Sequence, residues 1–112
     1  ILLIGVSYKK NTDDDRESPT FEFIKILDKK KISFDYHDPY FAKLRRGRNN
    51  KKLRISIKLT KKNLEKYSAV VLLTDHDKLN YDLIANHSKL IFDTRGKFKN
   101  TNFKDNKNII YC

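Results

Sequence analysis

Charged and aromatic side chains follow several apolar runs of this sequence, in a pattern suited to anion binding. They are Tyr8, Lys9 and Lys10 after the first run, Asp75 and His76 after a later run, and Asp93 and Arg95 after the next. Lysine supplies a point charge, whereas arginine offers a planar fork that binds two oxygens at once. If these runs are neighbouring parallel strands, the cations converge on one crevice and suit a diphosphate. Pairing of Lys9 and Arg95 with Asp13–Asp15 fits the same pattern equally well.

Several common catalytic and nucleotide-binding motifs are missing from the sequence. Gly5 stands alone after the first run, so the chain has neither the GxGxxG turn that binds dinucleotides nor a P-loop. Cys112 is the single cysteine, which excludes an internal disulfide and a multi-thiolate metal site. It has no nearby histidine, and we expect it to be reduced and to have no catalytic role.

The histidines and the acidic cluster do not predict a metal site. His37, His76 and His87 lack the spacing of metal ligands, and we interpret each as a surface or loop residue. Three adjacent carboxylates such as Asp13–Asp15 do not converge on one cation without further ligands. We expect one or two of them to position Arg16 through hydrogen bonds, and a purely structural pair of Arg16 with Glu17 fits the sequence equally well.

Composition limits the class of protein. A chain of 112 residues, with 38% hydrophobic and 35% charged residues, can form one domain with one core. No apolar run approaches the ~18–20 residues of a membrane span, and no signal peptide is recognisable, so we expect a cytoplasmic protein. The net charge of +11 invites a nucleic-acid interpretation, but the lysines are scattered and form no single stripe. We expect a fragment of a longer protein, because the chain begins in mid-strand without methionine.

The hydrophobic pattern predicts alternating strands and helices. Strands are expected at 1–7, 32–36, 69–73, 90–92 and 109–111, where apolar residues run together or alternate. Helices are expected after Ser18-Pro19, from Thr60 to about Tyr67, and around residues 80–86. The basic segment 40–52 is expected to be a loop, and the alternation at 53–59 favours an extended or edge segment.

This alternation predicts a single α/β domain over residues 1–112, with a doubly wound, mostly parallel sheet of about five strands and helices on both faces. The fold would be Rossmann-like, without the GxGxxG turn. In such sheets the ligand lies outside the carboxyl ends of the strands, near the switch in strand order. Two other functions stay open: a receiver-like signalling domain with Asp75 as phospho-acceptor, and a basic nucleic-acid-binding module.

Four motifs resemble one family. The segment GVSYKKNTDDDRESP, residues 5–19, resembles the signature that opens the C-terminal, UDP-binding domain of UDP-glucose/GDP-mannose dehydrogenases. The similarity continues in order with YHDPY at 36–40, LTDH at 73–76 and FDTR at 92–95. The RESP, DPY and TDH forms are most similar to the bacterial UDP-N-acetylglucosamine 6-dehydrogenase branch. UDP-glucose, UDP-N-acetylmannosamine and GDP-mannose relatives stay open.

The resemblance implies a role in an oxidoreductase. Members oxidise the C6 hydroxyl of a nucleotide sugar, here UDP-N-acetylglucosamine or UDP-glucose, to the uronate in two NAD-dependent steps. An N-terminal Rossmann domain would bind NAD, and a helical central domain would form a homodimer. The domain that resembles this chain would close over the nucleotide. By motif position, Tyr8 and Lys9 would contact the nucleotide sugar, Arg95 its nucleotide portion, and Arg16 would reach NAD.

The chain also departs from the complete family pattern. The catalytic cysteine motif is absent and Cys112 does not match it, so we assign no catalytic residue and expect the isolated chain to be inactive. Gly96 stands where relatives often carry asparagine. The expected partners are the UDP-sugar substrate and the other domains of the same enzyme, with no specific nucleic acid and no membrane.

Overall fold

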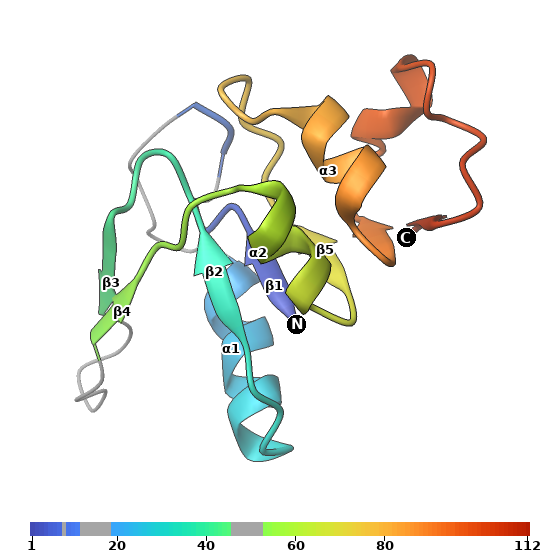
Figure 1. Cartoon of the computed structure of the whole chain (residues 1–112). Coiled ribbons are helices and arrows are strands. Elements are labelled where there is room, and N and C mark those ends of the chain that lie inside the picture. Colours follow the sequence, from blue (N-terminus) through green and yellow to red (C-terminus); the bar gives the residue numbers. More distant parts are fainter. Residues whose placement is uncertain (8, 12–18, 46–52) are drawn as a thin grey trace.

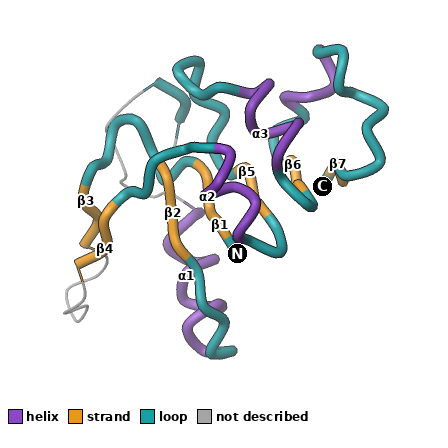
Figure 2. Tube along the Cα trace, viewed as in Figure 1, coloured by secondary structure: helices purple, strands orange, loops and turns teal. Residues whose placement is uncertain are grey.

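A parallel β-sheet forms the centre of the computed structural model, which describes residues 1–7, 9–11, 19–45 and 53–112. The strands of this sheet are β1 (Leu2–Ile4), β2 (Asp35–His37), β5 (Val70–Leu72), β6 (Ile91–Asp93) and β7 (Ile109–Tyr111). Within the described residues they lie in the order β2-β1-β5-β6-β7, and each neighbouring pair is parallel (Figure 1, with β6 and β7 labelled in Figure 2). The chain therefore moves outward from β1 to β2 and then crosses to β5, on the other side of β1. This crossing places the switch in strand order between β1 and β5.

Helices cover both faces of the sheet, as the sequence predicted (Figure 2). The helices are α1 (Pro19–Lys29), α2 (Lys61–Lys66), α3 (Tyr81–His87) and the 3₁₀-helix η1 (Lys97–Asn100). Leu2 and Ile4 pack with residues of α2, α3 and η1 on one face, whereas Leu3 packs with α1 on the other. Because successive strand residues point to opposite faces, β1 must be apolar throughout. No helix within the described ranges is long and apolar enough to cross a membrane.

Two of the predicted helices begin at their capping residues. The Thr60 side chain accepts a hydrogen bond from the Asn63 backbone N–H at 3.0 Å, and α2 follows it. The Asn80 side chain accepts from the Leu83 N–H at 3.0 Å in the same way at the start of α3. Each cap satisfies a backbone donor that has no partner inside its helix. The expected cap of α1, Ser18, lies outside the described residues.

One predicted loop contains a strand. Strand β3 (Lys43–Arg45) pairs antiparallel with strand β4 (Leu53–Ile55). The prediction of a loop over residues 40–52 was therefore wrong at 43–45. Leu44 explains the difference, because it is only 2% exposed and packs into the core on the α1 face. The free energy gained by burying Leu44 favours the strand, although the residues on either side of it are charged. The extended segment predicted from residue 53 is confirmed for β4.

Gly5 allows the ends of β1 and β5 to approach one another closely. Its φ is +88°, a backbone conformation that residues other than glycine rarely adopt. A Cβ at this position would lie 2.5 Å from the Thr74 Cβ and 2.6 Å from the Thr74 carbonyl oxygen. The glycine is therefore required for packing between two neighbouring strand ends.

We predict that Gly5→Ala lowers the free energy of unfolding by about 2–4 kcal/mol, because it adds both backbone strain and overpacking. Gly96→Ala is the matched control, since Gly96 also has a positive φ of 69° but a Cβ there would meet only the Lys99 side chain, at 3.5 Å or more. The Gly96→Ala substitution should lower the free energy of unfolding by about 1 kcal/mol. Urea denaturation of both variants measures the difference, and equal costs would contradict the close-packing explanation.

Candidate functional site

The parallel register brings the ends of β1, β2, β5 and β6 to one edge of the sheet. Ile4 of β1 is level with His37 of β2 and with Leu72 of β5. Leu72 is in turn level with Asp93 of β6. The residues that follow these strands therefore lie next to one another along the carboxyl edge, although they are far apart in sequence. This edge contains the switch point where ligands bind in such sheets.

A buried carboxylate joins three of the strand ends. Asp38 accepts hydrogen bonds from the Val6 N–H after β1 at 2.7 Å and from the Tyr40 N–H at 2.8 Å. Its Oδ2 atom also lies 2.9 Å from Nε2 of His76, which follows β5. Burial alone would raise the pKa of Asp38, but the hydrogen bonds from His76, Val6 and Tyr40 together hold that pKa below its usual value. Asp38 is therefore a stable buried anion.

The His76 ring is held in one tautomer. The Asn11 backbone N–H donates to Nδ1 of His76 at 2.7 Å, so Nδ1 is an acceptor and Nε2 carries the proton. The Nε2–H faces Asp38 and also lies 3.2 Å from the Ser7 hydroxyl oxygen. The imidazole packs on the Tyr40 ring, with ring centroids 4.8 Å apart. His76 thus connects the loop after β1 with the ends of β2 and β5.

A second set of contacts attaches the loop after β1 to the loop after β5. The Asn11 side chain donates to Asp77 Oδ2 at 2.8 Å and accepts from the Asp77 backbone N–H, also at 2.8 Å. Lys10 lies 3.7 Å from the same carboxylate. The hydrogen bond from Asn11 and the charge of Lys10 lower the pKa of Asp77. Asn11 itself has a φ of 63°, which asparagine tolerates better than most residues.

Backbone and side-chain hydrogen bonds fix the turn after β6. Asp93, which is fully buried, accepts from the Arg95 N–H at 3.0 Å and from the Phe98 N–H at 2.9 Å. The Arg95 Nε–H donates to the Leu73 carbonyl at 2.8 Å. This bond directs the arginine side chain across the end of β5, toward the switch point.

The structure brings two of the four predicted binding residues to the same edge. Lys9 is exposed, and its carbonyl accepts a hydrogen bond from the Ser7 hydroxyl at 2.7 Å. Lys9 follows β1 and Arg95 follows β6, and both of these strands adjoin β5, so the two strands lie about 10 Å apart, which is two strand spacings. Tyr8 and Arg16 lie outside the described residues, as do the aspartates 13–15.

The sequence interpretation missed the buried pair at the centre of this edge. His76 is 0% exposed, so its interpretation as a surface or loop histidine was wrong about burial, although it does lie in a loop. The sequence places Asp38 only within the YHDPY motif, yet its side chain is also 0% exposed. A sequence signal was available, since Asp38 directly follows β2 and His76 lies in the segment that follows β5, and both of these strands enter the core.

The described residues do not fit a metal ion or the pyrophosphate of NAD. No group of three or more histidine, cysteine or acidic side chains within the described ranges could hold a metal ion. Gly5 makes room for Thr74, whereas the glycines of a dinucleotide-binding turn make room for the ligand. The other glycines of that motif are absent from the sequence. We therefore assign no NAD chemistry to these residues.

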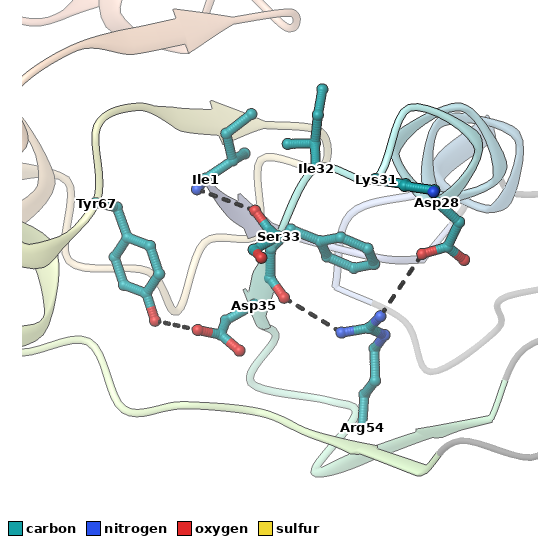
Figure 3. Close-up of a pocket in the computed structure, with 9 residues that line it drawn as sticks. Ile1, Asp28, Lys31, Ile32, Ser33, Asp35, Arg54 and Tyr67 are labelled. Carbon is teal, nitrogen blue, oxygen red and sulfur yellow. Dashed lines mark hydrogen bonds and ion pairs between the residues drawn. The ribbon is translucent and has the colours of Figure 1, made fainter.

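A cavity of about 660 Å³ lies at the opposite, amino-terminal edge of the sheet (Figure 3). Arg54 crosses it, 3.8 Å from Asp28, and Tyr67 donates a 2.6 Å hydrogen bond to Asp35. Ile1, the residue before β1, forms part of the wall. Arg54 already forms an ion pair with Asp28, and the Asp35 carboxylate adds negative charge, so the cavity suits a diphosphate less well than the carboxyl edge does.

Comparison with known proteins identifies the same group that the motifs resemble. Residues 2–100 match the sequence model for the UDP binding domain of the UDP-glucose/GDP-mannose dehydrogenase family. The UDP-N-acetyl-D-mannosamine dehydrogenase of Pyrococcus horikoshii is 30% identical over 104 residues, which are 88% of this chain and 22% of that protein. This chain thus spans less than a quarter of the length of that relative.

Solved structures show the same fold. The UDP-D-ManNAc dehydrogenase of P. horikoshii aligns over 98% of this chain and 24% of its own, with a TM-score of 0.62 and 25% identity. The native UDP-N-acetyl-mannosamine dehydrogenase of Staphylococcus aureus aligns over 98% of this chain and 25% of its own, with a TM-score of 0.60 and 24% identity. The second likeness concerns the fold alone.

We predict that Asp38→Asn lowers the free energy of unfolding by about 3 kcal/mol at neutral pH, because it leaves buried donors without an anion. The folded-state pKa of Asp38 lies below the unfolded value of about 3.9. The contribution of ionised Asp38 to the free energy of unfolding is therefore complete above the unfolded-state pKa, and it is lost as the pH falls through the folded-state pKa.

Denaturant titrations between pH 7 and pH 3 measure this difference. The gap between wild type and Asp38→Asn should narrow below about pH 4. Asp105→Asn, at an exposed position, is the control and should show little loss at any pH. A gap that stays constant down to pH 3 would contradict the assignment of Asp38 as a buried anion.

Proposed function

Because the chain belongs to the UDP-glucose/GDP-mannose dehydrogenase family, we propose that it binds the UDP portion of a nucleotide-sugar substrate at the carboxyl edge of its sheet. The observation that supports this proposal is that Lys9 and Arg95 follow the two strands that adjoin β5, with the Arg95 Nε–H bonded to the Leu73 carbonyl after β5. The two positive side chains complement the negative charge of a diphosphate, and both supply hydrogen-bond donors to its oxygens.

The two cations have different parts in this proposal. Lys9 follows the switch-point strand β1 and supplies a point charge to the diphosphate. Arg95 contacts the nucleotide portion, and its Nε–H bond to the Leu73 carbonyl sets the direction of the guanidinium before the ligand arrives. Tyr8 as a contact to the nucleotide sugar and Arg16 as a contact to NAD remain predictions from the family motif.

The proposed parent enzyme is an NAD-dependent dehydrogenase that oxidises the C6 hydroxyl of a UDP-sugar to a carboxylate. The Rossmann domain that holds NAD, and the catalytic cysteine, would lie outside this chain. The described residues bind and orient the substrate, which lowers the entropic cost of reaching the reactive geometry. We further propose a homodimer in the cytoplasm, where the exposed free thiol of Cys112 would stay reduced.

The sugar is the least determined part of the substrate. The DPY and TDH motifs favour UDP-N-acetylglucosamine, and UDP-glucose was the other prediction from the sequence. The matched relatives are named as UDP-N-acetylmannosamine dehydrogenases. We propose that the sugar of the substrate is an N-acetylhexosamine. The carboxyl edge contributes to binding the UDP, which UDP-N-acetylglucosamine and UDP-N-acetylmannosamine have in common.

The strand order of the sheet is shared by the alternative function, a receiver-like signalling domain. The order of the five parallel strands is also that of receiver domains. The match of residues 2–100 favours nucleotide-sugar binding over phospho-acceptor signalling.

We predict that Lys9→Ala and Arg95→Ala each weaken UDP binding to this chain about tenfold or more, because each removes a charge-assisted contact to phosphate. Isothermal titration calorimetry measures the dissociation constants. Arg95→Lys should fall between Arg95→Ala and wild type, since it keeps the charge but loses the planar fork.

Lys107→Ala is the matched control, because it removes one exposed positive charge near the start of β7, at the other edge of the sheet. Its affinity for UDP should stay within about twofold of wild type. The proposed site is wrong if the control and the two alanine variants weaken binding equally, or if none of them does.

A further inference from the structure

We infer that His76 is a positioning residue for Lys9, because its two ring nitrogens contact the two ends of the turn that carries this lysine. The inference rests on the proposed role of Lys9 in binding the diphosphate. Ser7 lies two residues before Lys9 and contacts Nε2, whereas Asn11 lies two residues after it and donates to Nδ1.

The Nδ1 side of the ring fixes the far end of the turn. Asn11 reaches the ring through its backbone N–H at 2.7 Å, and its side chain exchanges two hydrogen bonds with Asp77. These contacts hold Asn11 at a positive φ that would otherwise be costly. The direction of the chain leaving the turn is therefore set by residues of the β5 loop.

The Nε2 side fixes the near end. Ser7 is buried, and its hydroxyl lies 3.2 Å from Nε2 while donating to the Lys9 carbonyl at 2.7 Å. The Ser7 carbonyl accepts from the Thr74 hydroxyl at 2.7 Å. One imidazole, one serine and one threonine thus determine where the Lys9 backbone lies.

Asp38 explains why the ring does not adopt the other tautomer. An imidazole protonated at Nδ1 would present the Nε2 lone pair to the Asp38 anion and a proton to the Asn11 N–H, so both contacts would become repulsive. Because the pair is fully buried, water does not replace the lost hydrogen bonds. The buried anion therefore selects the tautomer, and the tautomer selects the conformation of the turn.

A lysine side chain is long and flexible, so the position of its backbone limits where its ammonium group can reach. A preformed turn removes part of the ordering cost of ligand binding. His76 should consequently affect the affinity for the nucleotide and leave the chemical step, which takes place elsewhere, unchanged.

Two substitutions divide the function of the ring. His76→Asn places an amide near the Nδ1 position and can keep the Asn11 contact, but it does not reach Asp38. His76→Gln places an amide near the Nε2 position and can keep the Asp38 contact, but it leaves the Asn11 N–H without its acceptor. Ile109→Ala, in the core near the start of β7, is the control for a general loss of stability.

The experiment combines ¹⁵N relaxation of the backbone amides with UDP titration, at a temperature where circular dichroism shows every variant to be folded. We expect the Lys9 and Asn11 amides to become more mobile in both His76 variants, with Asn11 affected most in His76→Gln. We also expect both variants to bind UDP about tenfold more weakly, whereas Ile109→Ala should match wild type in both measurements. In the complete enzyme, the same variants should raise KM and leave kcat unchanged.

The two measurements separate this inference from the function on which it rests. Absence of UDP binding by wild type would contradict the proposed function, while the relaxation data would still decide whether His76 orders the turn. Unchanged relaxation at Lys9 and Asn11 in both variants would overturn the inference. So would wild-type affinity for UDP in variants whose turn has become mobile.

Discussion

The carboxylate of Asp38 is the interaction on which the arrangement of this edge depends. An ionised carboxylate without partners is too costly to bury, so the chain must supply donors from wherever the fold provides them. Here they come from Val6 after β1, Tyr40 after β2 and His76 after β5. One anion thereby ties together three strand ends that are distant in sequence. The segment that carries Lys9 is positioned by this network, whereas Asp93 fixes the turn that carries Arg95.

The sheet topology explains why the proposed site and the cavity lie at opposite edges. Parallel strands place their carboxyl ends together, and the crossing from β2 to β5 opens the switch point between β1 and β5. Loops at this edge are free to carry function, because the strands beneath them supply the core. At the other edge, Arg54 and Tyr67 pair with acidic residues and join β2 to the segments around it. The volume of a cavity is therefore a poorer guide to this site than the direction of the strands.

Local sequence signals predicted most of the fold. Apolar runs and capping residues such as Thr60 and Asn80 act over a few residues, so the sequence alone shows them. Parallel strands also imply that Lys9 and Arg95 meet at one edge. Strand β3 could not be foreseen, because its pairing with β4 is non-local and one buried leucine decides it. The His76–Asp38 pair was missed for a similar reason: its members are 38 residues apart, and polar residues are exposed in most settings.

The most direct test of the account is the map of amide chemical-shift changes when UDP is added to the chain. We predict that the largest changes occur at the carboxyl edge around the switch point, at residues 5–7, 9–11, 73–77 and 93–96. Changes concentrated instead at Asp28, Arg54 and Tyr67 would place the nucleotide in the opposite cavity. That result would contradict the central claim that the strand ends bind the diphosphate.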